Sequence, residues 1–281
     1  MTHSLNNMSK KKITRQQLEI INRKKLHYPL PIAQKDYFLA IALELICSSN
    51  LKDRLIFKGG TALHHCYLSQ KRFSEDLDFT ALDKTITLDE IQSVIEANGV
   101  FKITKEYQSK FTIKIEKLQF EGLLGQNEHI KFEIDRFQNA ILPGRIIEYK
   151  NFWGIKSSPL VMDEIEICAE KIRAASQRVR YRDFYDLYYL LTELKVNLKD
   201  ATDLLYRKEA RTPIIAANIQ NNWLTAKKFK NQDLENIFCT DVVADHVSES
   251  LIQTIQFEDI LANVERGIKR TKFSISFITS P

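Results

Sequence analysis

The chain is poor in cysteine, and its four cysteines lie far apart in the sequence. Cys47, Cys66, Cys168 and Cys239 show none of the short spacings that bind zinc, and the six histidines show none either. The cysteines stand in apolar surroundings typical of helices. We therefore expect reduced, buried thiols in a cytosolic protein, which argues against a disulfide-stabilised scaffold.

Long apolar runs are also missing. No uninterrupted apolar segment reaches the length of about 20 residues that spans a membrane, and the first residues lack the apolar centre of a signal peptide. Internal repeats and low-complexity stretches are absent as well. We expect a cytoplasmic protein with no membrane partner.

The length and charge of the chain permit several classes of function. Its 281 residues suffice for one large or two modest domains, and a hydrophobic content of 44% suffices for a packed core. The charged fraction of 27% is that of an ordinary soluble protein. A formal net charge of +5 is a mild basic excess, which allows an anionic partner without requiring nucleic acid.

The most informative stretch of the sequence begins with a short apolar run at residues 55–57. This run is bounded sharply enough to predict a buried strand. Lys58 and the pair Gly59-Gly60 follow, and Thr61 then begins a helical pattern. A glycine pair lets the backbone turn without the steric penalty of a Cβ. It also lets an anion such as phosphate approach the amide groups at the start of the helix.

A second strand follows this helix and carries two acidic residues. Asp76 and Asp78 alternate with Leu77 and Phe79, so both carboxylates leave the same face of the strand. Neighbouring carboxylates repel each other, and a divalent cation is the usual means of keeping both ionised. Either motif alone also fits an ordinary turn or a solvated strand edge, but their combination is more specific.

The order strand, Gly-Gly, helix and strand with Asp-x-Asp resembles the nucleotidyltransferase core shared with DNA polymerase beta. More narrowly, the wording K-G-G-T-A-L followed by R-F-S-E-D-L-D-F resembles the AbiEii toxin family of nucleotidyltransferases. The resemblance covers most of residues 35–195. It implies an α+β fold, in which a polymerase-beta-like mixed sheet with helices is followed by a helical C-terminal domain.

A polymerase-beta-like site needs a third carboxylate on a strand beside Asp-x-Asp. Two strand-like runs with alternating apolar residues follow, at residues 111–120 and 130–137. In the second run, Glu133 and Asp135 share the polar face. Relatives carry an acidic residue between aliphatic residues at this place, which favours Glu133 as the third metal ligand. Asp135 stays open as the alternative.

The stretch at residues 162–191 resembles the second motif of the family, because A-E-K-I is followed on the next helix by R-D-F-Y-D-L. Asp183 and Asp186 are one turn apart and therefore neighbours on that helix. In one interpretation Lys171 binds a phosphate, Asp183 is catalytic and Asp186 binds the nucleotide. In the other, the aspartates hold arginines in an ion-pair network between two helices. The basic cluster concerned is Arg173, Arg178, Arg180 and Arg182.

The rest of the pattern predicts a second, helical domain. Pro143-Gly144 and the irregular residues 151–159 mark a boundary, so we divide the chain into a nucleotidyltransferase core, 1–158, and a helical domain, 159–281, that completes the active-site cleft. Helices are predicted at residues 14–26, 34–49, 87–98, 198–207, 233–238 and 248–269.

The resemblance implies an enzyme that transfers a nucleoside monophosphate from an NTP to an RNA, with the tRNA 3′ end as the expected acceptor, and releases pyrophosphate. The cofactor would be Mg²⁺ or Mn²⁺. The implied catalytic residues are Asp76, Asp78, Lys171 and Asp183; the implied nucleotide-binding residues are Lys58, Gly59, Gly60, Thr61, Lys171 and Asp186; and the implied metal ligands are Asp76, Asp78 and Glu133 or Asp135.

The resemblance also implies a biological setting. Members of the family are toxins of toxin–antitoxin or phage-defence systems, and a separately encoded antitoxin silences them. Two alternatives stay open on the sequence. One is a catalytically inactive nucleotide- or RNA-binding module on the same fold, against which the intact Asp76 and Asp78 pair argues. The other is a nucleotidyltransferase that modifies a protein.

Overall fold

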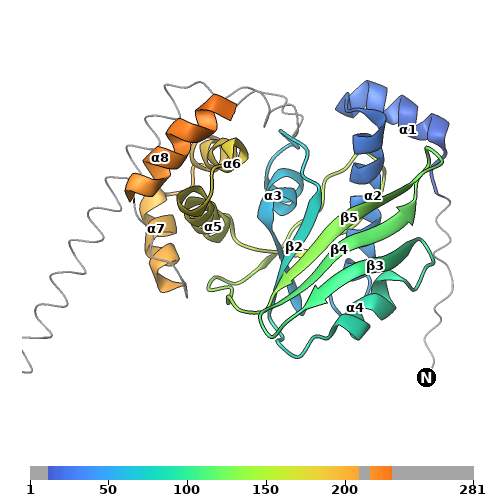
Figure 1. The fold of residues 1–281 in the computed structure, drawn as a ribbon, viewed down its shortest axis with the longest axis horizontal. Helices are drawn as coiled ribbons and strands as arrows, with labels where there is room; N and C mark the ends of the chain where they lie inside the picture. Colours follow the sequence, from blue (N-terminus) through green and yellow to red (C-terminus); the bar gives the residue numbers. More distant parts are fainter. Residues whose placement is uncertain (1–11, 209–215, 230–281) are drawn as a thin grey trace, which may run out of the picture.

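A mixed sheet of seven strands organises the fold, in the order β3-β4-β5-β2-β1-β7-β6 (Figure 1). The structure is a computed structural model that describes residues 12–208 and 216–229. The helices predicted at 233–238 and 248–269, and Cys239, lie outside the described residues. The strands are β1 (Leu55–Lys58), β2 (Asp76–Ala81), β3 (Phe101–Gln108), β4 (Thr112–Glu121), β5 (Asn127–Asp135), β6 (Arg145–Ile146) and β7 (Leu160–Val161).

The three central strands set the register of the polar residues. Strand β1 runs antiparallel to β2 and places Lys58 opposite Asp78. Strand β2 runs parallel to β5 and places Asp78 opposite Glu133. Residues that are opposite each other on paired strands project from the same face of a sheet. The pairing therefore gathers side chains from residues 58, 78 and 133, which are far apart in the sequence.

One face of the strands β3, β4 and β5 is covered by helices α2 (Leu30–Cys47) and α4 (Leu88–Ile95) (Figure 1). Ile113 and Ile115 on β4, and Phe132 on β5, point into this fully buried core. Successive side chains of a strand point to opposite faces, so the polar residues between them line the other face. Near the N-terminus, α1 (Arg15–Ile21) continues into the π-helical turn η1 (Asn22–Leu26).

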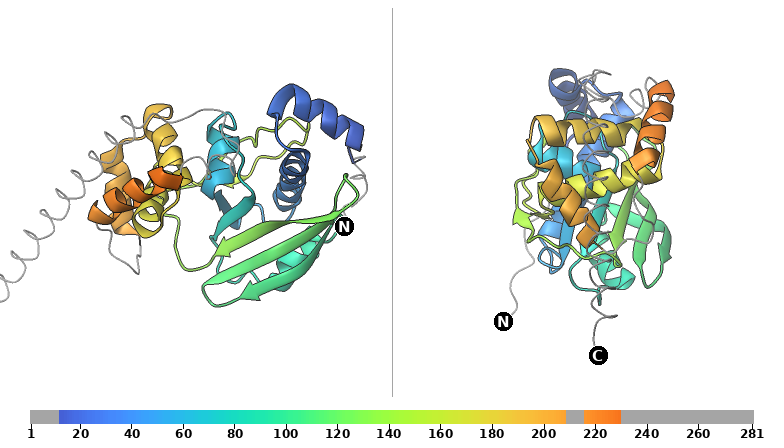
Figure 2. Two further views of the ribbon diagram at one scale, coloured as in Figure 1. Left: turned by 45° about the horizontal axis from the view of Figure 1, so that its top comes forward. Right: turned by 90° about the vertical axis from the view of Figure 1, so that its left-hand side faces the viewer.

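The C-terminal helices gather at the opposite end of the molecule from strands β3, β4 and β5 (Figure 2). They share a second apolar core, which reaches the sheet through Ile56 and includes Leu63 and Leu68 from the segment between β1 and β2. The boundary at residue 158 stays a prediction. These helices are α5 (Glu164–Gln177), α6 (Tyr181–Thr192), α7 (Leu198–Arg207), α8 (Ala216–Ala226) and the short 3₁₀ turn η3 (Lys227–Phe229).

Local signals in the sequence explain most element boundaries. The Thr87 hydroxyl accepts a hydrogen bond from the Glu90 N–H and caps α4. Helix α2 begins before the predicted residue 34, because Pro31 lies in its first turn, where proline is tolerated. Strand β3 was not predicted, since it is largely exposed at the edge of the sheet and shows little apolar alternation. Among the described residues, no helix is both long and apolar enough to cross a membrane.

Candidate active site

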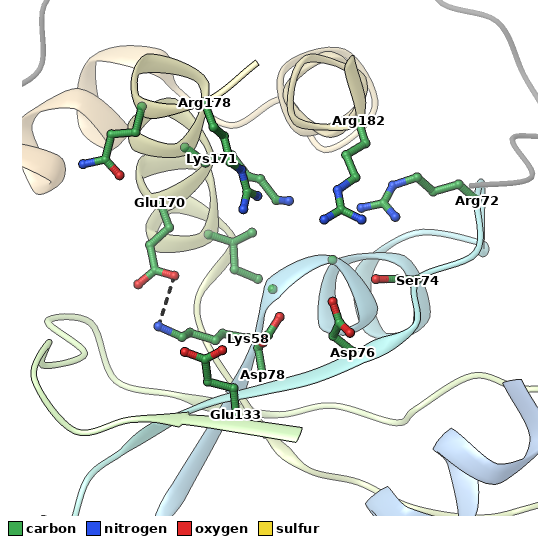
Figure 3. A pocket seen from close by; sticks show the side chains of 15 residues that line it. Lys58, Arg72, Ser74, Asp76, Asp78, Glu133, Glu170, Lys171, Arg178 and Arg182 are labelled. Atoms are coloured by element: carbon green, nitrogen blue, oxygen red, sulfur yellow. Dashed lines mark ion pairs between the residues drawn. The ribbon is translucent and has the colours of Figure 1, made fainter. Parts of the chain in front are cut away.

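A pocket of about 320 Å³ lies between the central strands and the C-terminal helices (Figure 3). Apart from the ion pair between Lys58 on β1 and Glu170 on α5, its two walls carry opposite charge. The strands supply one wall with the carboxylates of Asp76, Asp78 and Glu133, and the helices α5 and α6, with the loop before β2, supply the cationic wall. The cationic side chains on that wall are Arg72, Lys171, Arg178 and Arg182.

The surroundings of the two aspartates of β2 disfavour the ionised form of both side chains. Burial, followed by the charge of Asp76, raises the pKa of Asp78 to about 7. Burial, followed by the charge of Glu75, also raises the pKa of Asp76. The Oδ1 atom of Asp76 is buried and has no hydrogen-bond partner among the described residues. Lys58 and Lys171 lower the pKa of Asp78, and Lys131 and Arg182 lower that of Asp76, but burial outweighs them. A bound cation would therefore stabilise the ionised pair further.

The donor set of this wall fits Mg²⁺ rather than a metal held wholly by protein. Among the residues described, no group of three or more histidine, cysteine, aspartate or glutamate side chains is arranged to hold a metal ion. Mg²⁺ usually keeps several waters and binds through one or two carboxylates together with phosphate oxygens of the substrate. Asp76 and Asp78, with one oxygen unsatisfied, meet that requirement.

Glu133 has the better geometry for a third carboxylate. It lies opposite Asp78 on the neighbouring parallel strand and lines the pocket. Its Oε2 atom is 3.0 Å from the Lys114 Nζ atom, and both side chains of this ion pair are about two-fifths exposed. Exposed ion pairs are weak, typically about 0–1 kcal/mol. Glu133 is therefore free to exchange this partner for a metal ion.

Asp135, in contrast, has both carboxylate oxygens engaged and does not line the pocket. Its Oδ1 atom accepts hydrogen bonds from the backbone N–H groups of Phe137 and Gln138, at 2.8 and 3.0 Å. Its Oδ2 atom accepts one from the Lys58 Nζ atom at 3.3 Å. Asp135 thus stabilises the turn after β5 and holds a lysine of the pocket.

The glycine pair is required by the close approach of its neighbours. Gly59 has a φ of +79°, and a Cβ there would lie 2.5 Å from the Asp78 Oδ2 atom. A Cβ on Gly60 would lie 2.6 Å from the Arg72 Nη2 atom. Both glycines line the pocket at the start of α3 (Gly59–Ala62), which continues as the π-helical segment η2 (Leu63–Tyr67). The predicted turn between strand and helix is confirmed.

The residues on either side of the glycine pair have different surroundings. Thr61 is fully buried and does not line the pocket; its hydroxyl donates to the Asp76 carbonyl at 2.5 Å and so fixes the start of β2. Lys58 does line the pocket, with Nζ 3.5 Å from the Glu170 carboxylate. Burial opposes the charge of Lys58, but Glu170 and Asp135 outweigh it and raise its pKa.

Lys171 and Arg178 line the pocket and are held from behind by two aspartates. The Lys171 Nζ atom is 2.6 Å from Asp186 Oδ2 and 3.4 Å from Asp183 Oδ1. Arg178 donates to both oxygens of Asp183, at 2.8 and 3.0 Å. Both aspartates are fully buried, and neither lines the pocket. The ion-pair network expected in the second interpretation is therefore present, and it positions two cations of the site.

Arg72 joins the same network from the loop before β2. It donates to both oxygens of Asp186, at 2.8 and 2.7 Å, and both side chains are buried. Asp186 also contacts the His64 Nε2 atom at 2.9 Å. Burial opposes the charge of Asp186, but Arg72, followed by Lys171, lowers its pKa well below the usual range. Sequence reasoning missed Arg72, and its only signal was its place in R-F-S-E-D-L-D-F.

The predicted basic cluster is divided by the fold. Arg182 lines the pocket and points toward Asp76 (Figure 3), and we find no ion pair for it within the described part of the chain. Arg173 and Arg180 do not line the pocket. Arg173 is buried on α5, whereas Arg180 is exposed at the start of α6.

Glu170 is a further pocket residue that the sequence analysis did not single out. It accepts a hydrogen bond from the buried Lys208 at 2.9 Å and pairs with Lys58. Burial alone would raise the pKa of Glu170, but Lys58, followed by Lys208, outweighs it and lowers the pKa to about 2. Its signal was the apolar spacing of α5, which turns the glutamate next to Lys171 toward the sheet.

Comparison with known proteins agrees with this architecture. The structure is similar to MenT4, a nucleotidyltransferase toxin from Mycobacterium tuberculosis H37Rv, with a TM-score of 0.66 and 22% sequence identity over 86% of this chain and 89% of that one. This likeness confirms the predicted α+β fold, a mixed sheet with a helical C-terminal region. The chain is also 28% identical to an uncharacterised protein of Aquifex aeolicus (strain VF5) over 167 residues, or 59% of this chain and 72% of that protein.

Residues 42–263 of the chain match the family described as "Nucleotidyl transferase AbiEii toxin, Type IV TA system". That match includes both motifs, the whole pocket and the helices α5 to α8. It confirms the family resemblance seen in the sequence. The chain therefore belongs to the AbiEii family of nucleotidyltransferase toxins of type IV toxin–antitoxin systems.

Proposed function

We propose that this chain transfers a nucleoside monophosphate from an NTP to the 3′ end of a tRNA, with Mg²⁺ or Mn²⁺ as the cofactor. The observation that carries the proposal is the pair of opposed walls in one pocket. The carboxylates of Asp76 and Asp78, whose pKa values are raised, face a cationic wall on α5 and α6. A metal–triphosphate complex, which presents cation and anion side by side, matches such a surface.

The cationic wall would bind the triphosphate. Arg182, with no ion pair found for it among the described residues, is placed to donate to phosphate oxygens from α6. Lys171 and Arg178 add charge from positions that Asp186 and Asp183 hold. The amide groups at Gly59-Gly60 lie at the start of a helix, where anions are favoured. Pre-positioned donors of this kind stabilise the charge that builds up on the leaving group.

Asp76 and Asp78 would hold the metal, and Glu133, on exchanging Lys114 for the metal, would be the third carboxylate. When bound, the metal would offset phosphate charge and favour the ionised form of the acceptor hydroxyl. In the reaction, the acceptor oxygen forms a bond to the α-phosphorus of the NTP as its proton passes to water. The bond from the α-phosphorus to the bridging oxygen breaks, and pyrophosphate leaves with the electron pair.

Asp183 and Asp186 act through other residues in this proposal. Their oxygens contact Lys171, Arg178 and Arg72 at distances from 2.6 to 3.4 Å. Because they are buried and do not line the pocket, we assign them a positioning role rather than direct contact with the nucleotide. Thr61 has the same kind of role through the backbone of β2.

The family match supports the biological setting. A type IV toxin–antitoxin family implies an NTP substrate and an antitoxin partner. We propose a cytoplasmic toxin that a separately encoded antitoxin silences. The mild basic excess of the chain suits an RNA acceptor.

The test is transfer of label from each of the four NTPs, in the presence of Mg²⁺, to total tRNA or to a cell lysate. We expect a labelled product that ribonuclease destroys and protease does not. The Asp76→Asn and Asp78→Asn variants should give none, whereas Asp53→Asn, an exposed control, should match the wild type. Label lost to protease would assign a protein acceptor. Absence of transfer with every NTP would leave an inactive binding module.

A further inference from the structure

A second pocket, of about 430 Å³, lies on the open face of β4 and β5. It shares Asp76, Asp78 and Glu133 with the first pocket, so the three carboxylates stand between the two hollows. The nucleotide site proposed above accounts for the first pocket only. The second pocket is lined otherwise by Lys114, Glu116, Lys117, His129, Lys131 and Phe132.

The sheet register places cationic side chains directly beside the carboxylates. Lys131 on β5 lies opposite Asp76, and Lys114 on β4 lies opposite Glu133. A register shift interrupts the β4–β5 pairing between Ile115 and Leu118, and both of these residues are buried. The two residues between them therefore both belong to the open face, which brings Lys117 into the pocket.

The second pocket is lined by three lysines and four carboxylates, of which Asp76 and Asp78 are the pair that the metal would compensate. Its glutamates are both paired with lysines, Glu133 with Lys114 and Glu116 with Lys105. Lys117 and Lys131 are exposed, and we find no ion pair for either within the described residues. Burial, followed by the charges of Lys35, Lys117 and Lys131, lowers the pKa of His129. An anionic ligand would compensate the charges of Lys117 and Lys131.

Resting on the nucleotidyltransferase function proposed above, we infer that this second pocket holds the acceptor as a single-stranded polynucleotide end, with its backbone phosphates on Lys117 and Lys131. The NTP would lie on the α5 and α6 side of the carboxylates, and the acceptor on the β4 and β5 side. The terminal hydroxyl would then meet the α-phosphorus between the two hollows, at Asp76 and Asp78.

The chemistry of the lining favours a backbone over a base or a protein side chain. The lining offers little stacking surface to a base, because Phe132 is fully buried in the core and the other ring among the lining residues is the half-buried imidazole of His129. Lysines act as point charges and suit phosphates whose exact orientation varies. Phosphate contacts position a nucleic acid without reading its sequence. A polynucleotide end carries such phosphates next to its terminal hydroxyl, as this surface requires.

The test compares two doubly substituted proteins. One carries both Lys117→Gln and Lys131→Gln. The control carries both Lys24→Gln and Lys52→Gln, on exposed lysines away from both pockets. The probes are a single-stranded oligoribonucleotide of mixed sequence, measured at several salt concentrations, and each NTP with Mg²⁺. Each phosphate contact on a single strand contributes roughly 0.7 to the slope of log affinity against log salt, so we expect the first variant to lower the slope by about 1.4. Its NTP affinity should equal that of the wild type.

Three results would overturn the inference. In the first, the salt dependence of oligoribonucleotide binding is the same in the Lys117 and Lys131 variant as in the wild type. In the second, the control variant loses as much of this salt dependence. In the third, the Lys117 and Lys131 variant loses NTP affinity together with RNA affinity. Failure of the proposed function is a separate result, in which wild-type protein transfers no label from any NTP to any acceptor. Oligoribonucleotide binding through Lys117 and Lys131 is measured without transfer, so the two failures are distinguishable.

Discussion

Replacing Asp78 by asparagine tests whether the ionised carboxylate pair lowers the free energy of unfolding when no metal is bound. Asparagine keeps the shape of the side chain and removes the charge. Burial, followed by the charge of Asp76, raises the pKa of Asp78 to about 7 from an ordinary value of 3.8. A group whose pKa is raised on folding binds more protons in the folded state, so the free energy of unfolding falls as pH rises from about 4 to about 7. The Asp78→Asn variant lacks this loss.

The magnitude follows from the two pKa values. At about 1.4 kcal/mol for each tenfold change, the difference between 3.8 and about 7 sets a ceiling of about 4 kcal/mol. Asp78 is partly exposed to the pocket, and solvent there screens the charge. We therefore expect the Asp78→Asn variant to be more stable than the wild type by about 1–2 kcal/mol at pH 8 without metal. That corresponds to a rise in Tm of roughly 2–6 °C.

Thermal unfolding at pH 4 and pH 8 in a metal chelator measures this effect. The difference in Tm should be much smaller at pH 4, where Asp78 is protonated in the folded chain and, with an ordinary pKa of 3.8, in roughly two-fifths of the unfolded chains. Addition of Mg²⁺ at pH 8 should raise the Tm of the wild type more than that of the variant, because a ligand stabilises the state that binds it. Asp53→Asn, on a carboxylate whose side chain is 76% exposed, serves as the control. A variant no more stable than the wild type at pH 8 would refute the reasoning.

Three further predictions separate catalytic from structural residues. Lys171→Ala should lower the free energy of unfolding by about 2 kcal/mol. This is less than the 3–5 kcal/mol typical of a broken buried ion pair, because an arginine remains paired with each of the two aspartates. Chemical denaturation measures the change, and an unchanged midpoint would contradict it. Arg182→Ala should change stability by less than about 0.5 kcal/mol but weaken NTP binding in calorimetry. Equal NTP affinity would remove Arg182 from the site. Glu133→Gln should abolish transfer and keep the Tm, whereas Asp135→Asn should lower the Tm, since Asp135 accepts two backbone N–H bonds; the reverse pattern would make Asp135 the third metal ligand.

The parts of the site that follow from local geometry could be predicted from the sequence. Alternation along a strand places Asp76 and Asp78 on one face, and the structure confirms this, with Leu77 and Phe79 buried between and after them. The turn at the glycine pair between strand and helix could be predicted equally well, because only glycine adopts the φ of Gly59 without strain. Both signals depend on neighbours within a few residues in the sequence.

Contacts between distant segments could not be predicted in this way. Arg72 belongs to the cationic wall because Asp186, 114 residues later, accepts both of its donors. The sequence left Glu133 and Asp135 as alternatives on one strand face. In the tertiary structure the turn after β5 and Lys58 occupy the oxygens of Asp135, whereas Glu133 lines the pocket, which is the basis for proposing Glu133 as the ligand.

The sequence by itself determined the secondary structure of the strand–turn–helix–strand segment and the family to which the chain belongs. Short-range rules suffice there, since periodicity, glycine conformation and capping act over a few residues. Only the tertiary structure decided that Asp183 and Asp186 face inward onto cations and that Arg182 faces the pocket. The physical reason is that a helix surface offers several faces to its neighbours, and the packing of α5 and α6 against the sheet selects which of them is buried.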